Sequence, residues 1–359
     1  MTVHIARNVR LSQYTTFELG GPARLFVTVG SEEELRDALG FARVERMPVF
    51  VLGGGSNLVV ADRGFDGMVI HLRAKGVETR TEGDRTLLEV AAGEAWDPFV
   101  ERAVSAGLAG LECLSGIPGS VGATPIQNVG AYGQEVAQTI VEVRSMDATT
   151  GELHRRAPEQ CGFRYRHSVF KEAAARDEIV THVTFALRAG APTLRYPELQ
   201  RAAAAQSATP TLASVRATVI ALRAAKSMVI DPADPNRRSA GSFFTNPIVS
   251  ARQADEVARR AVLAGVVADA SEMPRYPEGD EVKLSAGWLI ERSGMAKGLR
   301  RGSVGISSKH ALALVHHGGG SAHELLALAR EVIDTVLDRF GVRLRPEPVL
   351  LGFHEDEAL

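Results

Sequence analysis

Residues 110–135 read GLECLSGIPGSVGATPIQNVGAYGQE, and this stretch decides how the rest of the chain is organised. Glycine and proline are so dense here that no helix or strand pattern survives, which predicts a long structured loop. The loop is nevertheless apolar, with leucine, isoleucine or valine at 111, 114, 117, 121, 126 and 129. We expect such a segment inside the protein, where its peptide groups need hydrogen-bond partners. A ligand rich in acceptors would provide them, and an irregular core crossover without a ligand is the alternative.

A second glycine-rich turn lies upstream, in PVFVLGGGSNLVV at residues 48–60. A predicted strand at 48–52 runs directly into three glycines, where backbone N–H groups can converge on a phosphate without an intruding Cβ. The turn is not a Walker loop, because no GK[ST] follows, and it lacks the GxGxxG spacing of a Rossmann turn. Taken alone, it is equally compatible with a tight turn between two strands. The glycine-rich residues 116–122 favour the phosphate interpretation, since two such loops could clasp one diphosphate.

Composition limits the classes of protein to consider. The length of 359 residues predicts two or three domains, and the hydrophobic content of 45% is that of a soluble globular protein. The net charge of −2, with basic residues spread along the chain, gives no support for nucleic acid or a membrane surface as a partner. The first ten residues lack the apolar core of a signal peptide, and no apolar run approaches membrane-spanning length. Cys113 and Cys161 are too few for a disulfide framework, so we expect reduced, buried thiols in a cytoplasmic enzyme.

Periodicity predicts strands and helices along the whole chain. Strands are expected at 24–29, 48–52, 68–72, 86–91, 140–146 and 178–187, with β-rich pieces at 309–317 and 342–352. Helices are expected to begin at Ser31, where Glu34 completes a capping box, and at Asp97, and to span 211–227, 252–264 and 321–340. Residues 189–210 are expected to form an inserted loop with Tyr196 near its tip. The proline- and aspartate-rich residues 228–241 are interpreted as a domain boundary.

Several isolated polar residues lie in unusual local settings. Arg166 belongs to CGFRYRHSVFK (161–171), where basic side chains alternate with aromatic ones, although a solvated turn is the alternative. Ser242 follows Gly241, and local sequence alone favours a helix cap. Glu347 lies between Pro346 and Pro348, which fix its backbone direction and prevent a regular ladder.

Other chemistries find little support in the sequence. His316 and His317 are adjacent and have no companion spacing, so we expect surface histidines rather than metal ligands. A GxSxG elbow, which a serine hydrolase would need, is missing. From the residues alone, the chain is predicted to be a nucleotide- or diphosphate-binding enzyme whose reaction stays open.

Seven motifs, in order, extend from about residue 14 to residue 352. They are TTFELGGPARLFV, VLGGGSNLVV, GLECLSGIPGSVGATPIQNVGAYG, FRYRHSVFK, AGSFFTNP, KLSAGWLIERSG and RPEPVLLG. Through them the chain resembles the UDP-N-acetylenolpyruvoylglucosamine reductases (UDP-N-acetylmuramate dehydrogenases). It is similar to the longer of the two types in that family, which carries a tyrosine loop over the substrate.

The resemblance implies an α+β protein with a vanillyl-alcohol-oxidase-like FAD-binding fold of two α/β subdomains and a C-terminal α+β substrate domain. The implied boundaries are 1–70 for the first FAD-binding subdomain, 71–226 for the second, completed by 341–359, and 227–340 for the substrate-binding domain. The implied enzyme is an NADPH-dependent flavoenzyme with FAD as cofactor. It would reduce the enolpyruvyl group of UDP-N-acetylglucosamine enolpyruvate to UDP-N-acetylmuramate in peptidoglycan precursor synthesis, as a cytoplasmic monomer.

The resemblance also assigns individual residues. For FAD binding it implies Gly53, Gly54, Gly55, Ser56, Asn57, Ile117, Pro118, Gly119, Ser120, Gly122 and Ala123. Arg166 would lie by the flavin and the enolpyruvyl group, Ser242 would be the proton donor, and Glu347 the catalytic carboxyl group. The residues expected to contact the UDP-sugar are Tyr196, Lys226, Asn246 and His310.

One departure from the family pattern is visible, because relatives often read EPE where this chain has Arg345, Pro346 and Glu347. Two other classes stay open from the sequence. One is a sugar-nucleotide transferase or hydrolase without redox chemistry, and the other is a flavin-carrying protein without catalysis.

Overall fold

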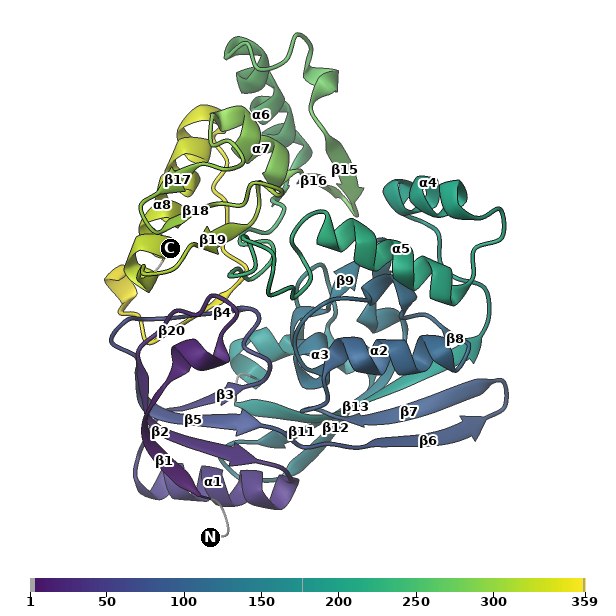
Figure 1. Ribbon diagram of the computed structural model, residues 1–359, viewed down its shortest axis with the longest axis vertical. Helices are drawn as coiled ribbons and strands as arrows, with labels where there is room; N and C mark the ends of the chain where they lie inside the picture. Colours follow the sequence, from purple (N-terminus) through teal and green to yellow (C-terminus); the bar gives the residue numbers. More distant parts are fainter. Residues whose placement is uncertain (1–3, 176, 358) are drawn as a thin grey trace. The chain divides into compact units, whose positions relative to one another are not determined.

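The structure is a computed structural model that describes residues 4–175, 177–357 and 359. The chain folds into two compact units (Figure 1). The first unit comprises 4–9, Ala23–Gly55 and Asp66–Ile230, and the second Arg10–Pro22, Ser56–Phe65 and Asp231–Leu359. Within the described residues, no helix has the length and apolar character needed to cross a membrane.

A four-stranded sheet forms one part of the first unit. Its strand order is β1-β2-β5-β3, with bounds β1 Ile5–Arg10, β2 Pro22–Val29, β3 Val49–Leu52 and β5 Phe65–Leu72. The helix α1 (Glu32–Val44) covers this sheet with Leu35, Leu39 and other apolar residues of one face (Figure 1). α1 begins where the sequence predicts, because the Ser31 hydroxyl accepts a hydrogen bond from the Glu34 N–H at 3.1 Å. The predicted capping box is only half formed, since the Glu34 carboxylate accepts from the Gly30 N–H and not from that of Ser31.

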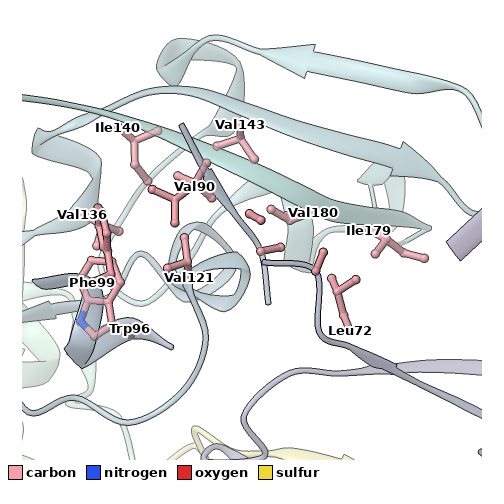
Figure 2. Packing of buried hydrophobic residues seen from close by; sticks show 14 of the residues in the cluster. Leu72, Val90, Trp96, Phe99, Val121, Val136, Ile140, Val143, Ile179 and Val180 are labelled. Carbon is pink, nitrogen blue, oxygen red and sulfur yellow. The ribbon is translucent and has the colours of Figure 1, made fainter. Parts of the chain in front are cut away.

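An antiparallel sheet forms the other part of the first unit. It has the order β12-β11-β13-β7-β6, with β8 paired to β13; the bounds are β6 Val77–Glu82, β7 Arg85–Ala91, β8 Leu108–Ala109, β11 Ile140–Asp147, β12 Leu153–Arg156 and β13 Glu178–Ala189. The helix α2 (Trp96–Ser105) packs its aromatic residues against this sheet: Trp96 and Phe99 each lie within 6 Å of the Phe185 ring. Figure 2 shows Trp96 and Phe99 beside Val136 in this core. The sheet and α2 together form the rigid support for the central loop, residues 110–135.

The rest of the first unit consists of short elements and two helices that pack on each other. Their bounds are α3 Thr124–Gln127, β9 Gly130–Ala131, β10 Gln134–Glu135, α4 Pro197–Gln206 and α5 Leu212–Ala224. α4 packs on α5 through Leu199, which is fully buried against Val215 and Val219. α5 in turn packs on α2.

The second unit packs three helices around a core of its own (Figure 1). The helices are α6 Ala251–Leu263, α7 Ala286–Ser293 and α8 Ala322–Phe340, and the strands are β4 Leu58–Val60, β14 Ile248–Val249, β15 Arg275–Glu278, β16 Glu281–Leu284, β17 Arg300–Arg301, β18 Val304–Ile306, β19 Leu314–His316 and β20 Val349–Leu351. β20 pairs with β4 in parallel, with Val349 opposite Leu58. The C-terminal strand therefore lies beside the residues that directly follow the first glycine-rich turn.

Most elements predicted from periodicity are present, but several expectations are wrong. Residues 110–135 are irregular for most of their length, but they contain the short helix α3 and the paired strands β9 and β10, where no helix or strand was expected. Residues 189–210 contain the helix α4 and are not simply a loop, because Pro197 suits a first helical turn and the alanines that follow favour a helix. The two β-rich pieces are shorter than predicted: only Leu314–His316 forms a strand within 309–317, and only Val349–Leu351 within 342–352. The strand β6, VETRTE, was not expected, since its exposed, polar sequence shows no apolar alternation.

We predict that Leu35→Ala lowers the free energy of unfolding by about 2–5 kcal/mol, because it leaves a cavity between α1 and its sheet. Urea denaturation followed by circular dichroism measures this loss. Val44→Ala on the same helix is the matched control: its side chain is 80% exposed, so the change should stay within about 0.5 kcal/mol. Equal effects of the two variants would contradict the packing of α1.

Candidate functional site

The two glycine-rich turns predicted from the sequence lie against each other in the first unit. A Cβ built on Gly54 would lie 2.7 Å from the Cα of Gly119, and one on Gly53 would lie 2.5 Å from the Ser120 hydroxyl oxygen. Real Cβ atoms do not come this close to other atoms, so only glycine allows the two backbones to approach. The prediction that the two turns converge is therefore confirmed at Gly53 and Gly54 on one turn and at Gly119 and Ser120 on the other.

The second turn is held in place by the segment that leads into α2. The Trp96 N–H donates to the Gly119 carbonyl at 3.0 Å, the Val121 N–H to Glu94, and the Gly122 N–H to Ala92. A Cβ on Gly122 would also lie 2.5 Å from the Ala92 Cβ. Three backbone hydrogen bonds and this close contact therefore fix the backbone between Gly119 and Gly122.

This convergence leaves hydrogen-bond donors available. In the part of the chain that the structure describes, the backbone N–H groups of Gly54, Gly55, Gly119 and Ser120 have no hydrogen-bond partner. Converging backbone N–H groups without an intervening Cβ are suited to the oxygens of a phosphate or diphosphate. The arrangement fits the diphosphate of a dinucleotide cofactor such as FAD.

Ser56 and Asn57, the last residues of the first predicted cradle, belong to the second unit. The Asn57 amide donates to the Glu347 carbonyl at 3.3 Å, and the Asn57 carbonyl accepts from the Val349 N–H at 3.0 Å. The Glu347 N–H donates to the Phe243 carbonyl at 2.8 Å. The structure therefore brings Asn57, Glu347 and the residue next to Ser242 together, although they are far apart in the sequence.

Ser242 is not a helix cap. No helix begins at Gly241 among the described residues, and the next helix, α6, starts at Ala251 and is capped by Ser250. The Ser242 hydroxyl has no hydrogen-bond partner within the described part of the chain. The interpretation that local sequence favoured is therefore wrong, and its predicted role as a proton donor stays a prediction.

Asn246 and His310 also lie in the second unit. The Asn246 side-chain oxygen accepts a hydrogen bond from the Ala286 N–H at 3.0 Å, in the first turn of α7. This contact gives Asn246 a structural role, because it satisfies a backbone donor that the helix cannot. The His310 carbonyl accepts from Ala313, and the neighbouring Leu312 carbonyl accepts from Phe243 at 2.7 Å.

Arg166 lies in the first unit, beside the central loop. Its Nη2 donates to the Gly130 carbonyl at 2.8 Å, and its guanidinium lies 5.3 Å from the Tyr165 ring centroid. Its backbone is left-handed, with φ of +53°, and so are those of Asn128 and Tyr132 in the loop. Side-chain-bearing residues in this region are strained, and strain of this kind concentrates at functional sites where the surroundings enforce it.

The Asn128 side chain helps to hold the left-handed backbone of this region in place. Its amide donates to Glu135 and to the Arg164 carbonyl, each at 3.0 Å, so it joins the central loop to residues 161–171. The Ser168 hydroxyl makes a second connection, to the Ile126 carbonyl. The segment around Arg166 is therefore fastened to the central loop, and the solvated-turn alternative is wrong.

Tyr196 and Lys226 lie together around Tyr132 of the central loop. The Tyr196 and Tyr132 rings meet edge to face, with centroids 5.6 Å apart, and the Lys226 Nζ lies 5.8 Å from the Tyr132 centroid. Burial raises the pKa of Tyr132 to about 12, so this phenol is neutral at physiological pH. The structure thus brings two of the four predicted UDP-sugar residues into one cluster.

Two buried arginines of α5 were not predicted from the sequence. Arg216 and Arg223 are seven residues apart, which places both on one helix face, and both are about nine-tenths buried. Two arginines at this spacing on the apolar face of a predicted helix were the pattern that could have indicated them. The Arg216 guanidinium donates to both carboxylate oxygens of Asp97, at 2.6 and 2.9 Å, and Asp97 also accepts from the Gly116 N–H.

Arg223 has a different environment. Burial lowers its pKa to about 10, and its Nε has no hydrogen-bond partner among the described residues. Its Nη2 donates to the Met228 carbonyl at 2.7 Å. The aliphatic part of the Arg223 side chain lies beside Gly116, because a Cβ on this glycine would lie 3.6 Å from the Arg223 Cδ.

The histidines and cysteines were considered as metal ligands. Within the described residues, no cluster of histidine, cysteine and carboxylate side chains could hold a metal ion. The expectation of surface histidines is wrong for His316, which is buried and lies 2.9 Å from the Phe17 carbonyl while its other ring nitrogen accepts from Gly320. Both cysteines are free and buried as expected, and burial raises the pKa of Cys113 to about 12 and that of Cys161 to about 11.

Two parts of the chain match models of known protein families. Residues 23–156 match the family model of an FAD binding domain, and this segment contains both glycine-rich turns of the first unit. The chain is therefore an FAD-binding protein. Residues 232–351 match a second model, the C-terminal domain of UDP-N-acetylenolpyruvoylglucosamine reductase.

Relatives that are similar over nearly the whole chain identify one family of FAD-binding proteins. A UDP-N-acetylenolpyruvoylglucosamine reductase of Thermobifida fusca is 50% identical over 98% of this chain and 99% of its own length, and one of Mycobacterium tuberculosis is 45% identical over 97% and 96%. The solved structure of the reductase from Thermus caldophilus is similar with a TM-score of 0.64 and 29% identity, covering 98% of this chain and 99% of that one. The chain belongs to the UDP-N-acetylenolpyruvoylglucosamine reductase family of FAD-containing oxidoreductases. The resemblance and the fold class predicted from the sequence are thereby confirmed.

We predict that Gly54→Val lowers the amount of FAD that copurifies with the protein. Its Cβ would occupy the space of Gly119 and separate the two turns whose N–H groups are expected to bind the diphosphate. The ratio of flavin to protein absorbance measures the loss. Gly40→Val on α1 is the control, since a Cβ there meets nothing within 4 Å. A folded Gly54→Val protein with its full complement of FAD would exclude this cradle.

We also predict that the contribution of Asp97 to stability depends on pH. Burial acts to raise its pKa, but the hydrogen bonds from Arg216 and the Gly116 N–H outweigh burial and hold the pKa below its ordinary value. A lowered carboxyl pKa stabilises the folded state above the ordinary value of about 3.9, and this stabilisation is lost as the pH falls through the folded-state pKa. Asp97→Asn should therefore melt below wild type at pH 7, and the gap should narrow below about pH 4.

Thermal melts between pH 7 and pH 3 measure this gap. Glu101→Gln is the control, because Glu101 lies 3.7 Å from the same arginine but is largely exposed. A gap for Asp97→Asn that stays constant over the whole pH range would show that the pair with Arg216 does not lower the pKa of Asp97.

Proposed function

We propose that this chain uses NADPH to reduce the enolpyruvyl group of UDP-N-acetylglucosamine enolpyruvate, giving UDP-N-acetylmuramate for peptidoglycan precursor synthesis. The observation that carries the proposal is 50% identity, over nearly the whole length of both chains, to a relative named for this reductase activity. The convergent glycine turns add a physical argument, because they fit the cofactor that such a reduction needs.

The proposed roles divide the chemistry between cofactor and protein. When bound, FAD supplies the redox chemistry, accepting hydride from NADPH and passing it to the terminal enol carbon of the substrate. Hydride addition leaves negative charge on the neighbouring carbon and its carboxylate. The Arg166 guanidinium is proposed to stabilise that charge, since a fixed cation is most effective where water is scarce. Its hydrogen bond to Gly130 and its enforced backbone support this role.

Ser242 is proposed to donate its proton to the charged carbon, which completes the reduction. A serine hydroxyl is a weak acid, so the role requires the strongly basic carbon that hydride addition creates. Its lack of a competing hydrogen-bond partner in the described structure supports the assignment. Glu347 is proposed to assist by hydrogen bonding, and its backbone is fixed by the bonds to Phe243 and Asn57.

The UDP-sugar is proposed to bind through Tyr196, Lys226, Asn246 and His310. Tyr196 and Lys226 already form a cluster with Tyr132. Asn246 is the least supported of the four, because its side-chain oxygen is engaged by α7. We further propose that the protein acts as a cytoplasmic monomer and that residues 227–340 form the substrate-binding domain.

Two measurements on the purified protein test the function. A yellow protein with FAD excludes the transferase or hydrolase alternative, for which no flavin is needed. NADPH oxidation that depends on the enolpyruvyl sugar nucleotide excludes a flavin carrier without catalysis. A yellow protein that oxidises NADPH equally with and without this substrate would refute the proposed reaction.

We predict that Ser242→Ala separates the two half-reactions. Reduction of the flavin by NADPH should keep a near wild-type rate, because no proton from Ser242 enters that step. Reoxidation by the enolpyruvyl substrate should slow by roughly 10²–10⁴-fold, the usual contribution of a positioned acid. Stopped-flow absorbance of the flavin reports both halves.

Ser250→Ala is the matched control, because Ser250 is a true helix cap whose hydroxyl accepts from the Gln253 N–H. It should lose about 1 kcal/mol of stability and keep both rates. If the rate of flavin reoxidation in Ser242→Ala stays within a few-fold of the wild-type rate, Ser242 is not the proton donor.

A further inference from the structure

The short segment that carries Tyr196 is anchored at both of its ends. At one end, the Thr193 N–H donates to the fully buried Glu112 carboxylate at 2.7 Å, and the Thr193 carbonyl accepts from the Cys113 thiol at 3.3 Å. At the other end, Leu199 is fully buried against α5. The residues between these anchors therefore have a defined position over the central loop.

Glu198 lies within this segment and faces Lys226. Its carboxylate oxygen is 2.7 Å from the Lys226 Nζ, and the two side chains are 35% and 32% exposed. Lys226 is also held by the Tyr132 ring, at 5.8 Å. The lysine proposed to bind the UDP-sugar thus has a carboxylate from its own chain as its anionic partner.

The location of Glu198 has a second possible explanation. It lies in the first turn of α4, where an acidic side chain stabilises the helix through the helix dipole. That effect requires only a negative charge near the helix end, and it does not require contact with Lys226. The two explanations predict different effects on anion binding.

We propose that Glu198 is a specificity-determining residue of the sugar-nucleotide site: its carboxylate binds the Lys226 ammonium until a ligand with at least two adjacent phosphate charges displaces it. The inference rests on the proposed function, since it takes the diphosphate of the UDP-sugar as the displacing group. An ion pair at this exposure is weak, so a diphosphate can replace it. An uncharged ligand gains nothing at Lys226 and leaves the pair in place.

Displacement needs only a rotation of the Glu198 side chain. Leu199 and Thr193 keep the segment on α5 and on the central loop, so neither α4 nor Tyr196 has to leave its position. The carboxylate stays close to the incoming phosphates after displacement and repels them. Glu198 therefore lowers the affinity for every anion, and only a ligand with high local charge overcomes it.

The test measures binding of inorganic pyrophosphate to the FAD-loaded protein by isothermal titration calorimetry. Glu198→Gln should bind pyrophosphate roughly two- to five-fold more tightly than wild type, the range expected for removing a partly exposed ion pair. Glu198→Ala, which also removes the hydrogen-bond acceptor, should bind at least as tightly as Glu198→Gln. Uridine, which has no charge at neutral pH, should bind all three proteins equally.

Two controls separate the explanations. Glu142→Gln removes the same charge from an ion pair of similar length, 2.6 Å to Arg155, elsewhere in the first unit, and should leave pyrophosphate binding unchanged. In a Lys226→Met background, Glu198→Gln should no longer increase the affinity. Unchanged or weaker pyrophosphate binding by both Glu198 variants overturns the proposal and leaves the helix-dipole role. An equal gain for uridine overturns it as well, since the site would simply have loosened.

The pyrophosphate titrations can be interpreted whether or not the protein catalyses the proposed reduction. If the wild-type protein shows no turnover of the enolpyruvyl sugar nucleotide, the proposed function fails, while the pyrophosphate titrations still decide the role of Glu198. If turnover is present and the titrations show no difference between variants, only the inference on Glu198 fails.

Discussion

The contact between Gly54 and Gly119 is the constraint on which the flavin-binding part of this protein depends. Two backbone turns from distant parts of the sequence meet where no Cβ can be accommodated. The glycines at the contact have no side chains that could hold the turns together, so the neighbouring structure must do so. β3 delivers the first turn, and the segment leading into α2 fixes the second through three backbone hydrogen bonds. The aromatic packing of Trp96, Phe99 and Phe185 keeps that segment on its sheet.

Charge is distributed around the central loop in a way that suits anionic ligands. Arg166, Arg223 and Lys226 all lie near it, and Asp97 takes part in a pair with Arg216 that fixes Gly116. A buried cation without a full set of partners is costly unless something compensates it, and a phosphate or carboxylate ligand can do so. Lys226 is not buried, and in this structure it is paired with the partly exposed carboxylate of Glu198.

Predictions from local sequence were wrong at positions whose main contact is with a distant part of the chain. Ser242 follows a glycine and looks like a helix cap, yet its neighbour Phe243 accepts a hydrogen bond from the Glu347 N–H about a hundred residues away. His316 looks like an exposed histidine beside glycines, yet it is buried against the Phe17 carbonyl. In both cases the neighbours in sequence carry no information about the partner, because the contact depends on chain segments that only the folded structure brings together. The polar strand β6 was missed for a related reason, since its pairing with β7 and not its own periodicity makes it a strand.

The sequence by itself determined the features that depend on backbone chemistry. These are the mainly irregular course of residues 110–135, the need for glycine at 53–55 and 119, the cap at Ser31 and the long helix α8. Its motifs also determined the family. Tertiary structure alone decided which of these features meet: that Gly54 faces Gly119, that Glu347 lies beside Asn57, and that Glu198 faces Lys226. The physical reason is that steric and capping preferences act within a few residues, whereas contacts between distant segments are fixed by the packing of the sheets and helices that carry them.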